Sequence, residues 1–180
     1  AFTSKSGGLT FENFANMGSF FPVFLRSVFL AFIATVFCLL IGYPLAYALS
    51  LEGLRLQKIF LMLIMLPMWM NFLLRTYAWM SILENTGILN SFLTAQGLPN
   101  ISIINTQGAV VLGMIYNYLP FMVLPIYSVI VKIDRSVIEA AQDLGSNSFR
   151  VFSRIVFPLS LPGVLSGITM VFVPSVSTFI

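Results

Sequence analysis

The chain has 180 residues, of which 58% are hydrophobic and only 8% are charged, and its formal net charge is +3. Soluble domains carry about 25% charged residues, so this composition excludes a soluble domain and indicates a membrane protein, whose small positive charge describes its loops and not a nucleic-acid partner. With no histidine and with Cys38 as its one cysteine, the chain offers almost no ligands for a metal or redox site and no internal disulfide.

Charge-poor runs divide the chain into four segments, each close to the roughly 20 residues that a helix needs to cross a bilayer. We predict membrane-spanning helices over residues 27–50, 59–83, 109–131 and 157–180. Prolines inside these runs remove backbone hydrogen bonds and are expected to kink the helices. The sequence GVLSG, from Gly163 to Gly167, has the small-xxx-small spacing that lets two membrane helices approach closely.

The connections between these runs differ in positive charge. Residues 51–58 hold two Lys or Arg residues, residues 84–108 hold none, and residues 132–156 hold four. The positive-inside rule therefore predicts that 51–58 and 132–156 are cytoplasmic, and that 84–108 and residues 1–26 are extracellular.

The two ends of the chain indicate a longer protein. Residues 1–26 contain no positive segment followed by an apolar one, so no signal peptide accounts for their predicted place outside. The last run reaches Ile180 without a charged flank. We therefore expect this chain to be the middle of a larger protein, with at least one earlier span.

The second run carries polar and aromatic residues in a helical pattern. Asn71, Arg75 and Trp79 recur at i, i+4 and i+8, which predicts a stripe that faces the bundle interior. Tyr77 and Glu84 recur at i and i+7 on a different face. We expect a structural role for Arg75, because its guanidinium can snorkel at the outer interface.

The third run places Tyr116 and Asn117 just before Pro120. A helix opened locally by proline can present polar atoms to a cavity. Hydrogen bonding within the core is an equally good interpretation of both residues.

The last connection, residues 132–156, contains start and stop signals for two short helices. Residues 136–139 (SVIE) match a capping box, Gly145 supplies a left-handed stop, and residues 146–148 can cap a second helix. The pattern predicts a helix–turn–helix elbow whose first helix covers about 136–145.

The first helix of this elbow has two faces. One is apolar, with Val137, Ala141 and Leu144, and another carries charge, with Arg135, Glu139 and Asp143. Amphipathic loops of this kind are usually held against their own bundle. A rigid, exposed element that contacts another protein is the sharper alternative.

The same connection carries a motif. Glu139-Ala140-Ala141, three residues, Gly145, nine residues and then IVFP (155–158) resembles the EAA motif of the membrane permeases of ABC importers, with phenylalanine where leucine is usual in the last group. The resemblance extends over nearly the whole chain. Residues 41–50 (IGYPLAYALS), 66–83 and 118–130 are similar to the spermidine/putrescine branch of that family.

This resemblance implies an all-α, polytopic transmembrane helix bundle of the type I ABC importer permease kind, in the bacterial cytoplasmic membrane and surrounded by lipid. It implies four further subunits: a second permease, two ATPases and an extracytoplasmic substrate-binding protein. The implied coupling helix would contact the ATPase through Glu139, Ala140, Ala141, Asp143 and Gly145.

We expect no catalysis in this chain itself. The P-loop pattern GxxxxGK[ST] is absent, and without histidine no Ser–His–Asp or Cys–His arrangement can form. ATP and magnesium would therefore bind to the partner ATPase.

The resemblance also implies inward transport of polyamines, whose ammonium groups need carboxylates and aromatic faces. The candidate pathway residues are Asn71, Tyr77, Trp79, Glu84, Tyr116 and Asn117. Three alternatives stay open: an ABC importer for ferric iron, thiamine or an anion; a passive channel or secondary carrier; and a structural membrane anchor. Tyr77 and Trp79 also fit an interfacial aromatic belt equally well.

Overall fold

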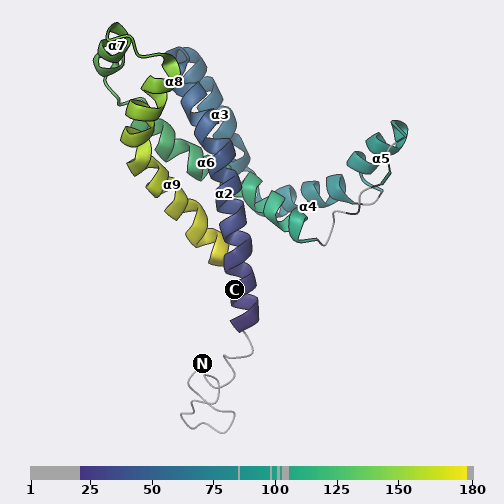
Figure 1. The fold of residues 1–180 in the computed structure, drawn as a ribbon. Helices are drawn as coiled ribbons and strands as arrows, with labels where there is room; N and C mark the ends of the chain where they lie inside the picture. Colours follow the sequence, from purple (N-terminus) through teal and green to yellow (C-terminus); the bar gives the residue numbers. More distant parts are fainter. Residues whose placement is uncertain (1–20, 85, 98, 101, 103–105, 178–180) are drawn as a thin grey trace, which may run out of the picture.

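The computed structural model describes residues 21–84, 86–97, 99–100, 102 and 106–177 (Figure 1). The predictions for residues 1–20 and 178–180, and for parts of 84–108, lie outside these residues. Every regular element in the described part is helical, which confirms the predicted all-α class. The elements are α2 (Phe21–Leu51), α3 (Leu54–Trp69), α4 (Phe72–Leu83), α5 (Ile88–Ala95), α6 (Gln107–Ile130), α7 (Arg135–Asp143), α8 (Ser148–Val151), a π-helical turn (Phe152–Val156) and α9 (Phe157–Ser177).

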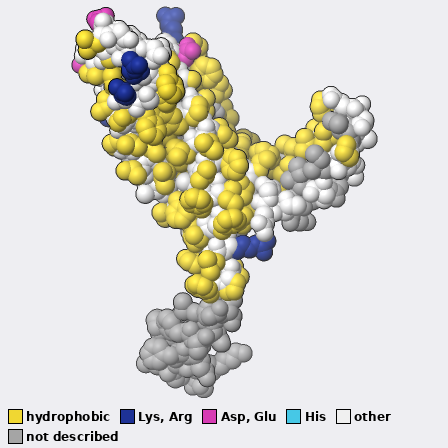
Figure 2. All heavy atoms as spheres, in the orientation of Figure 1, with side chains coloured by type: hydrophobic (Ala, Val, Ile, Leu, Met, Phe, Trp, Pro, Cys, Tyr) yellow, Lys and Arg dark blue, Asp and Glu magenta, His cyan; other side chains and the backbone are white. Residues whose placement is uncertain are grey.

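Three continuous helical stretches in the described residues are long and apolar enough to cross a membrane: Phe21–Leu51, Gln107–Ile130 and Ser148–Ser177. The third runs through α8, the π-helical turn and α9. The predicted boundary at residue 157 therefore lies inside a longer helix and not at its start. Figure 2 shows hydrophobic side chains over the visible face of these helices and the visible acidic side chains gathered at the end that carries α7.

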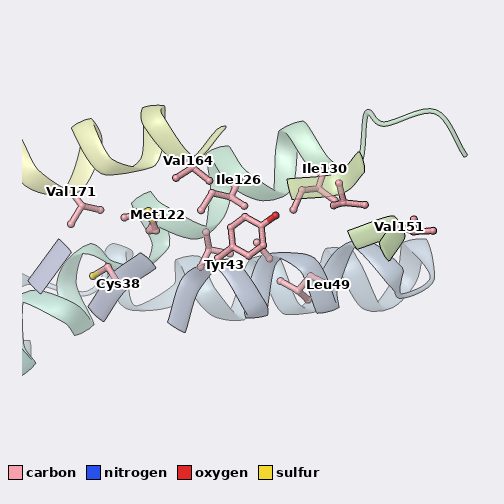
Figure 3. Close-up of a cluster of buried hydrophobic side chains, with 12 residues drawn as sticks. Cys38, Tyr43, Leu49, Met122, Ile126, Ile130, Val151, Val164 and Val171 are labelled. Carbon is pink, nitrogen blue, oxygen red and sulfur yellow. The ribbon is translucent and has the colours of Figure 1, made fainter. Parts of the chain in front are cut away.

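The helices α2, α6 and α9 pack together around one core. Gly42 of α2 faces Met122 of α6, and the Cys38 thiol donates a 3.8 Å hydrogen bond to the carbonyl of Ile115, so α2 and α6 run in the same direction. Figure 3 shows Tyr43 among the aliphatic side chains of this core. The buried members are Cys38, Tyr43, Ala46, Leu49, Met122, Val123, Ile126, Ile130, Val151, Val156, Val164 and Val171.

The glycines of GVLSG set the contact between α9 and α6. A Cβ on Gly163 would lie 3.1 Å from the Cα of Ile126, and a Cβ on Gly167 would lie 2.7 Å from the sulfur of Met122. The later glycine of α9, Gly167, contacts the earlier residue of α6, Met122, so these two helices are antiparallel. The small-xxx-small spacing therefore serves close helix packing, as predicted.

The run predicted as one span, residues 59–83, is divided between two helices, α3 and α4, which count as a fourth span only if this bent pair crosses the membrane together. The chain bends by 95° between Leu54–Trp69 and Leu73–Ala95. Pro67 weakens the last turn of α3, and Met70 is extended, with φ −75° and ψ 145°. The Asn71 side chain then accepts a 2.8 Å hydrogen bond from the N–H of Leu73 and begins α4. The expected kink is thus a full break.

Arg75 lies across this break. Its Nη1 donates a 3.1 Å hydrogen bond to the carbonyl of Pro67, so the guanidinium ties the first turn of α4 back to the end of α3. The side chain is half-buried. This contact agrees with the structural role predicted for Arg75, but the head group binds the helix break instead of reaching outward.

Candidate functional site

The first helix of the elbow, α7, has its N-cap earlier in the chain than the predicted Ser136. Asp134 is the N-cap of α7, and its Oδ1 accepts a 3.0 Å hydrogen bond from the N–H of Ser136. The predicted capping box at 136–139 is therefore wrong: Ser136 already lies in the first turn, and Val137 occupies the position that the box reserves for glutamate. The backbone N–H and the hydroxyl of Ser136 hold the pKa of Asp134 below its usual range.

Asp134→Ala is expected to increase hydrogen exchange across α7, whereas Ser136→Ala should increase it much less, because it keeps the backbone N–H that donates to Asp134. Because the pKa of Asp134 is lowered in the folded state, its stabilisation of α7 is complete above the ordinary pKa of aspartate. This stabilisation is lost as the pH falls through the lower, folded value. Asp134→Asn keeps a capping oxygen, so it should retain most of the protection. The measurement is hydrogen exchange by mass spectrometry. Equal loosening by Ser136→Ala would restore the capping box.

The C-terminal end of α7 follows the prediction. Gly145 has φ +81°, its N–H donates to the carbonyl of Gln142 at 2.8 Å, and the N–H of Ser146 donates to the carbonyl of Ala141 at 3.0 Å. These two bonds are a Schellman motif. Asn147 then caps α8 by accepting a 2.9 Å hydrogen bond from the N–H of Arg150. The left-handed stop and the cap within residues 146–148 are confirmed.

The predicted apolar face of α7 is only partly buried against the bundle. Ile138 and Ala141 pack against the core, whereas Val137 is 45% exposed and Leu144 is 87% exposed. In α8, Phe149 is 76% exposed. We call Val137, Leu144 and Phe149 the apolar tip. The elbow is therefore held against its own bundle through Ile138 and Ala141, whereas the side chains of the apolar tip are exposed.

The predicted coupling residues occupy the rest of α7 and its C-terminal end. Glu139, Ala140, Asp143 and Gly145 are exposed, and Ala141 is half-buried. Glu139 also borders a cavity of about 550 Å³ between α7 and the ends of α2, α3 and α6. Residues of both positively charged connections line this cavity, among them Leu51, Leu54, Ile133 and Gln142. Both connections therefore lie at the same end of the bundle.

Two of the predicted pathway residues meet across different helices. The rings of Trp79 in α4 and Tyr116 in α6 are 5.1 Å apart and edge-to-face, at 72°. Arg75 and Trp79 are half-buried and Leu83 is buried, so the i, i+4 stripe of α4 faces inward as predicted. Asn71, its first predicted member, lies outside the helix and caps it.

The other predicted pathway residues are not joined to this pair. Tyr77 is 65% exposed on the opposite side of α4, and Glu84 is the exposed C-cap residue of the same helix. The backbone carbonyl of Glu84 accepts a 3.1 Å hydrogen bond from the Asn90 side chain, so its carboxylate sits at a fixed turn. Next to Tyr116, Asn117 has a buried Oδ1 that accepts no hydrogen bond from the described residues.

Gln57 is an anchoring residue that the sequence did not reveal. It is 6% exposed, its Nε2 donates to the carbonyl of Glu52 at 2.7 Å, and its Oε1 accepts a 2.7 Å bond from the Tyr127 hydroxyl. These bonds hold the α2–α3 turn against α6. Its position between Arg55 and Lys58 gave only the signal of a solvent-exposed connection.

Comparison with known proteins gives a match along nearly the whole chain. Residues 3–180 match the family described as "Binding-protein-dependent transport system inner membrane component". The spermidine/putrescine transport system permease protein PotB of Haemophilus influenzae is 41% identical over 177 residues, which cover 95% of this chain and 61% of that protein.

Two relatives from Escherichia coli extend the comparison. PotB of that organism is 40% identical over 162 residues, covering 89% of this chain and 59% of the relative. The inner membrane ABC transporter permease protein YdcU is 28% identical over 174 residues, covering 89% and 56%. The chain thus spans about three-fifths of the length of the relatives that it matches.

Proposed function

Because this chain belongs to the family of inner membrane components of binding-protein-dependent transport systems, we propose that it is a permease subunit of an ATP-binding-cassette importer. It is a multi-pass inner membrane protein, with three helical stretches long and apolar enough to span the bilayer. Its proposed partners are a second permease, two ATPases that bind ATP and magnesium, and an extracytoplasmic substrate-binding protein. The proposed orientation puts residues 51–58 and 132–156 in the cytoplasm.

The observation that carries the proposal is the elbow. A coupling element has to be rigid and has to leave a surface for its partner. α7 is capped at both ends, while the apolar tip stays exposed beside the acidic residues Glu139 and Asp143. We assign the ATPase contact to Glu139, Ala140, Ala141, Asp143 and Gly145. Closure of the ATPases would then displace the elbow and shift the attached helices between inward-open and outward-open arrangements.

The proposed solute is a polyamine, in keeping with the names of the PotB relatives. A polycation needs aromatic faces and carboxylates along its path. Trp79 and Tyr116 supply two rings from different helices, and a cation against such a ring gains about 0.5 to 2 kcal/mol. The buried Oδ1 of Asn117 adds an acceptor next to Tyr116. Glu84, with Tyr77 on the same helix, is proposed for the outer mouth.

The test is ATP-dependent uptake of radiolabelled spermidine by vesicles that contain the complete transporter. We expect Glu84→Gln, which removes the charge and keeps the shape, to reduce uptake several-fold. The matched control is Glu52→Gln, which removes an exposed carboxylate at the α7 end of the bundle and should leave uptake unchanged. Normal uptake by Glu84→Gln at a normal protein level would exclude Glu84 from the path. Failure of an ATPase to co-purify would contradict the importer itself.

A further inference from the structure

The junction between the elbow and α9 is a π-helical turn, Phe152–Val156, in which the N–H of Phe157 bonds the carbonyl of Phe152. Such turns are rare and occur mostly as single turns inside α-helices. Pro158 follows directly and cannot donate to the carbonyl of Arg154, so the regular α-helical ladder is interrupted here. A joint that departs from the regular ladder can bend unless neighbouring side chains fix it.

Two tyrosines of α2 contact this joint. The Tyr47 ring lies 4.9 Å from that of Phe152, at 65°. The Tyr43 ring lies 5.9 Å from that of Phe152, at 82°, and 5.8 Å from that of Phe157, at 55°. Phe152 and Phe157 are the two residues whose backbone bond closes the π-helical turn. Tyr43 therefore spans the turn from one end to the other.

A buried hydrogen-bond chain fixes the same contact. Ser160 is 0% exposed, and its Oγ donates a 2.9 Å bond to the carbonyl of Phe157. The Tyr43 hydroxyl lies 2.8 Å from this Oγ. Because the single proton of the serine hydroxyl is engaged by Phe157, Tyr43 is the donor to Ser160. The chain Tyr43–Ser160–Phe157 thus ties α2 to the first turn of α9.

We propose that Tyr43 is a positioning residue of the transport cycle, which clamps the π-helical turn to α2 so that a displacement of the elbow moves α2 and α9 as one body. The proposal rests on the importer function proposed above. Without the clamp, the joint bends, and motion of α7 and α8 is absorbed before it reaches the bundle. The expected consequence is uncoupling, in which ATP is hydrolysed with less solute moved.

The experiment uses the complete transporter in proteoliposomes and measures ATP hydrolysed per spermidine imported. Tyr43→Phe keeps the ring contacts and removes the hydroxyl, and Ser160→Ala removes its acceptor. Each is expected to raise the ratio at least three-fold, and the double variant should raise it no further, because both changes break the same bond. Tyr118→Phe is the matched control, since it removes a hydroxyl that donates to the Pro174 carbonyl at 3.4 Å, elsewhere between α6 and α9.

Three outcomes separate the possibilities. A raised ratio for Tyr43→Phe and Ser160→Ala, with the control normal, supports the clamp. An unchanged ratio in both variants, or an equal rise in Tyr118→Phe, overturns the clamp and leaves the importer standing. No ATP-dependent uptake by the unmodified complex overturns the importer and the clamp together.

Discussion

Replacing Gly145 by valine is expected to abolish coupled uptake while the protein still reaches the membrane. Gly145 has φ +81°, and a Cβ placed there would meet nothing within 4 Å, so the strain is entirely in the backbone. A residue with a side chain loses roughly 1–2 kcal/mol in this conformation, and a β-branched one loses more. Relief of that strain breaks the Schellman bonds and redirects α8. The measurements are spermidine uptake and the amount of ATPase that co-purifies.

Gly97 offers a control with the same local chemistry. Its φ is +75°, a Cβ there also meets nothing within 4 Å, and it follows the end of α5. Gly97→Val therefore carries the same backbone strain at a place with no proposed coupling role, and it should retain uptake. Gly145→Asn should recover part of the activity, because asparagine tolerates the left-handed region. Equal loss in Gly97→Val would show that strain alone, and not the direction of the elbow, stops transport.

The second large effect is expected at the contact between α6 and α9. A Cβ on Gly163 would lie 2.9 Å from the carbonyl oxygen of Pro125 and 3.1 Å from the Cα of Ile126. Both are backbone atoms, so the added methyl can be accommodated only if the helices separate. Gly163→Ala should therefore destabilise the fold by about 1–3 kcal/mol. The measurement is the thermal unfolding midpoint in detergent, together with the protein yield.

Two other glycines test the cause. A Cβ on Gly113 in α6 meets nothing within 4 Å, so Gly113→Ala should stabilise the protein by about 0.5–1 kcal/mol through helix propensity alone. Gly167→Ala should fall between the two, because its closest neighbour is the flexible end of Met122, at 2.7 Å. A lower unfolding midpoint in Gly113→Ala would mean that the effect at Gly163 is not specific to the interface.

The parts of the fold that depend on local chemistry could be predicted from the sequence. Charge-poor runs located the long helices, and the left-handed preference of Gly145 located the end of α7. The same kind of signal failed where two residues compete for one role. Asp134 and Ser136 are both good N-caps, and only the path of the chain out of α6 decides between them. Pro67 predicted a kink, but the full break depends on the Asn71 cap and on the bond from Arg75 to Pro67.

The buried polar contacts could not be predicted from the sequence, for a different reason. Gln57 bonds Tyr127, 70 residues away, and Tyr43 meets Ser160, 117 residues away. No local pattern marks such pairs, since each residue alone fits either a loop or an apolar helix. The aromatic pair Trp79–Tyr116 is similar, because both residues were predicted for the pathway but only the packing of α4 on α6 brings their rings together.

The exposure of Leu144 and Phe149, at 87% and 76%, bears on how the cell has to make this protein. With the proposed orientation and the proposed ATPase contact, an inserted copy that lacks the partner would expose both apolar side chains to the cytosol, and exposed apolar surface favours aggregation and triage by chaperones and proteases. Synthesis of this chain in excess of the proposed ATPase would then shorten the lifetime of the chain. The lifetime of the chain would thus depend on how much of the proposed ATPase is available, and the two subunits would have to be produced in matching amounts.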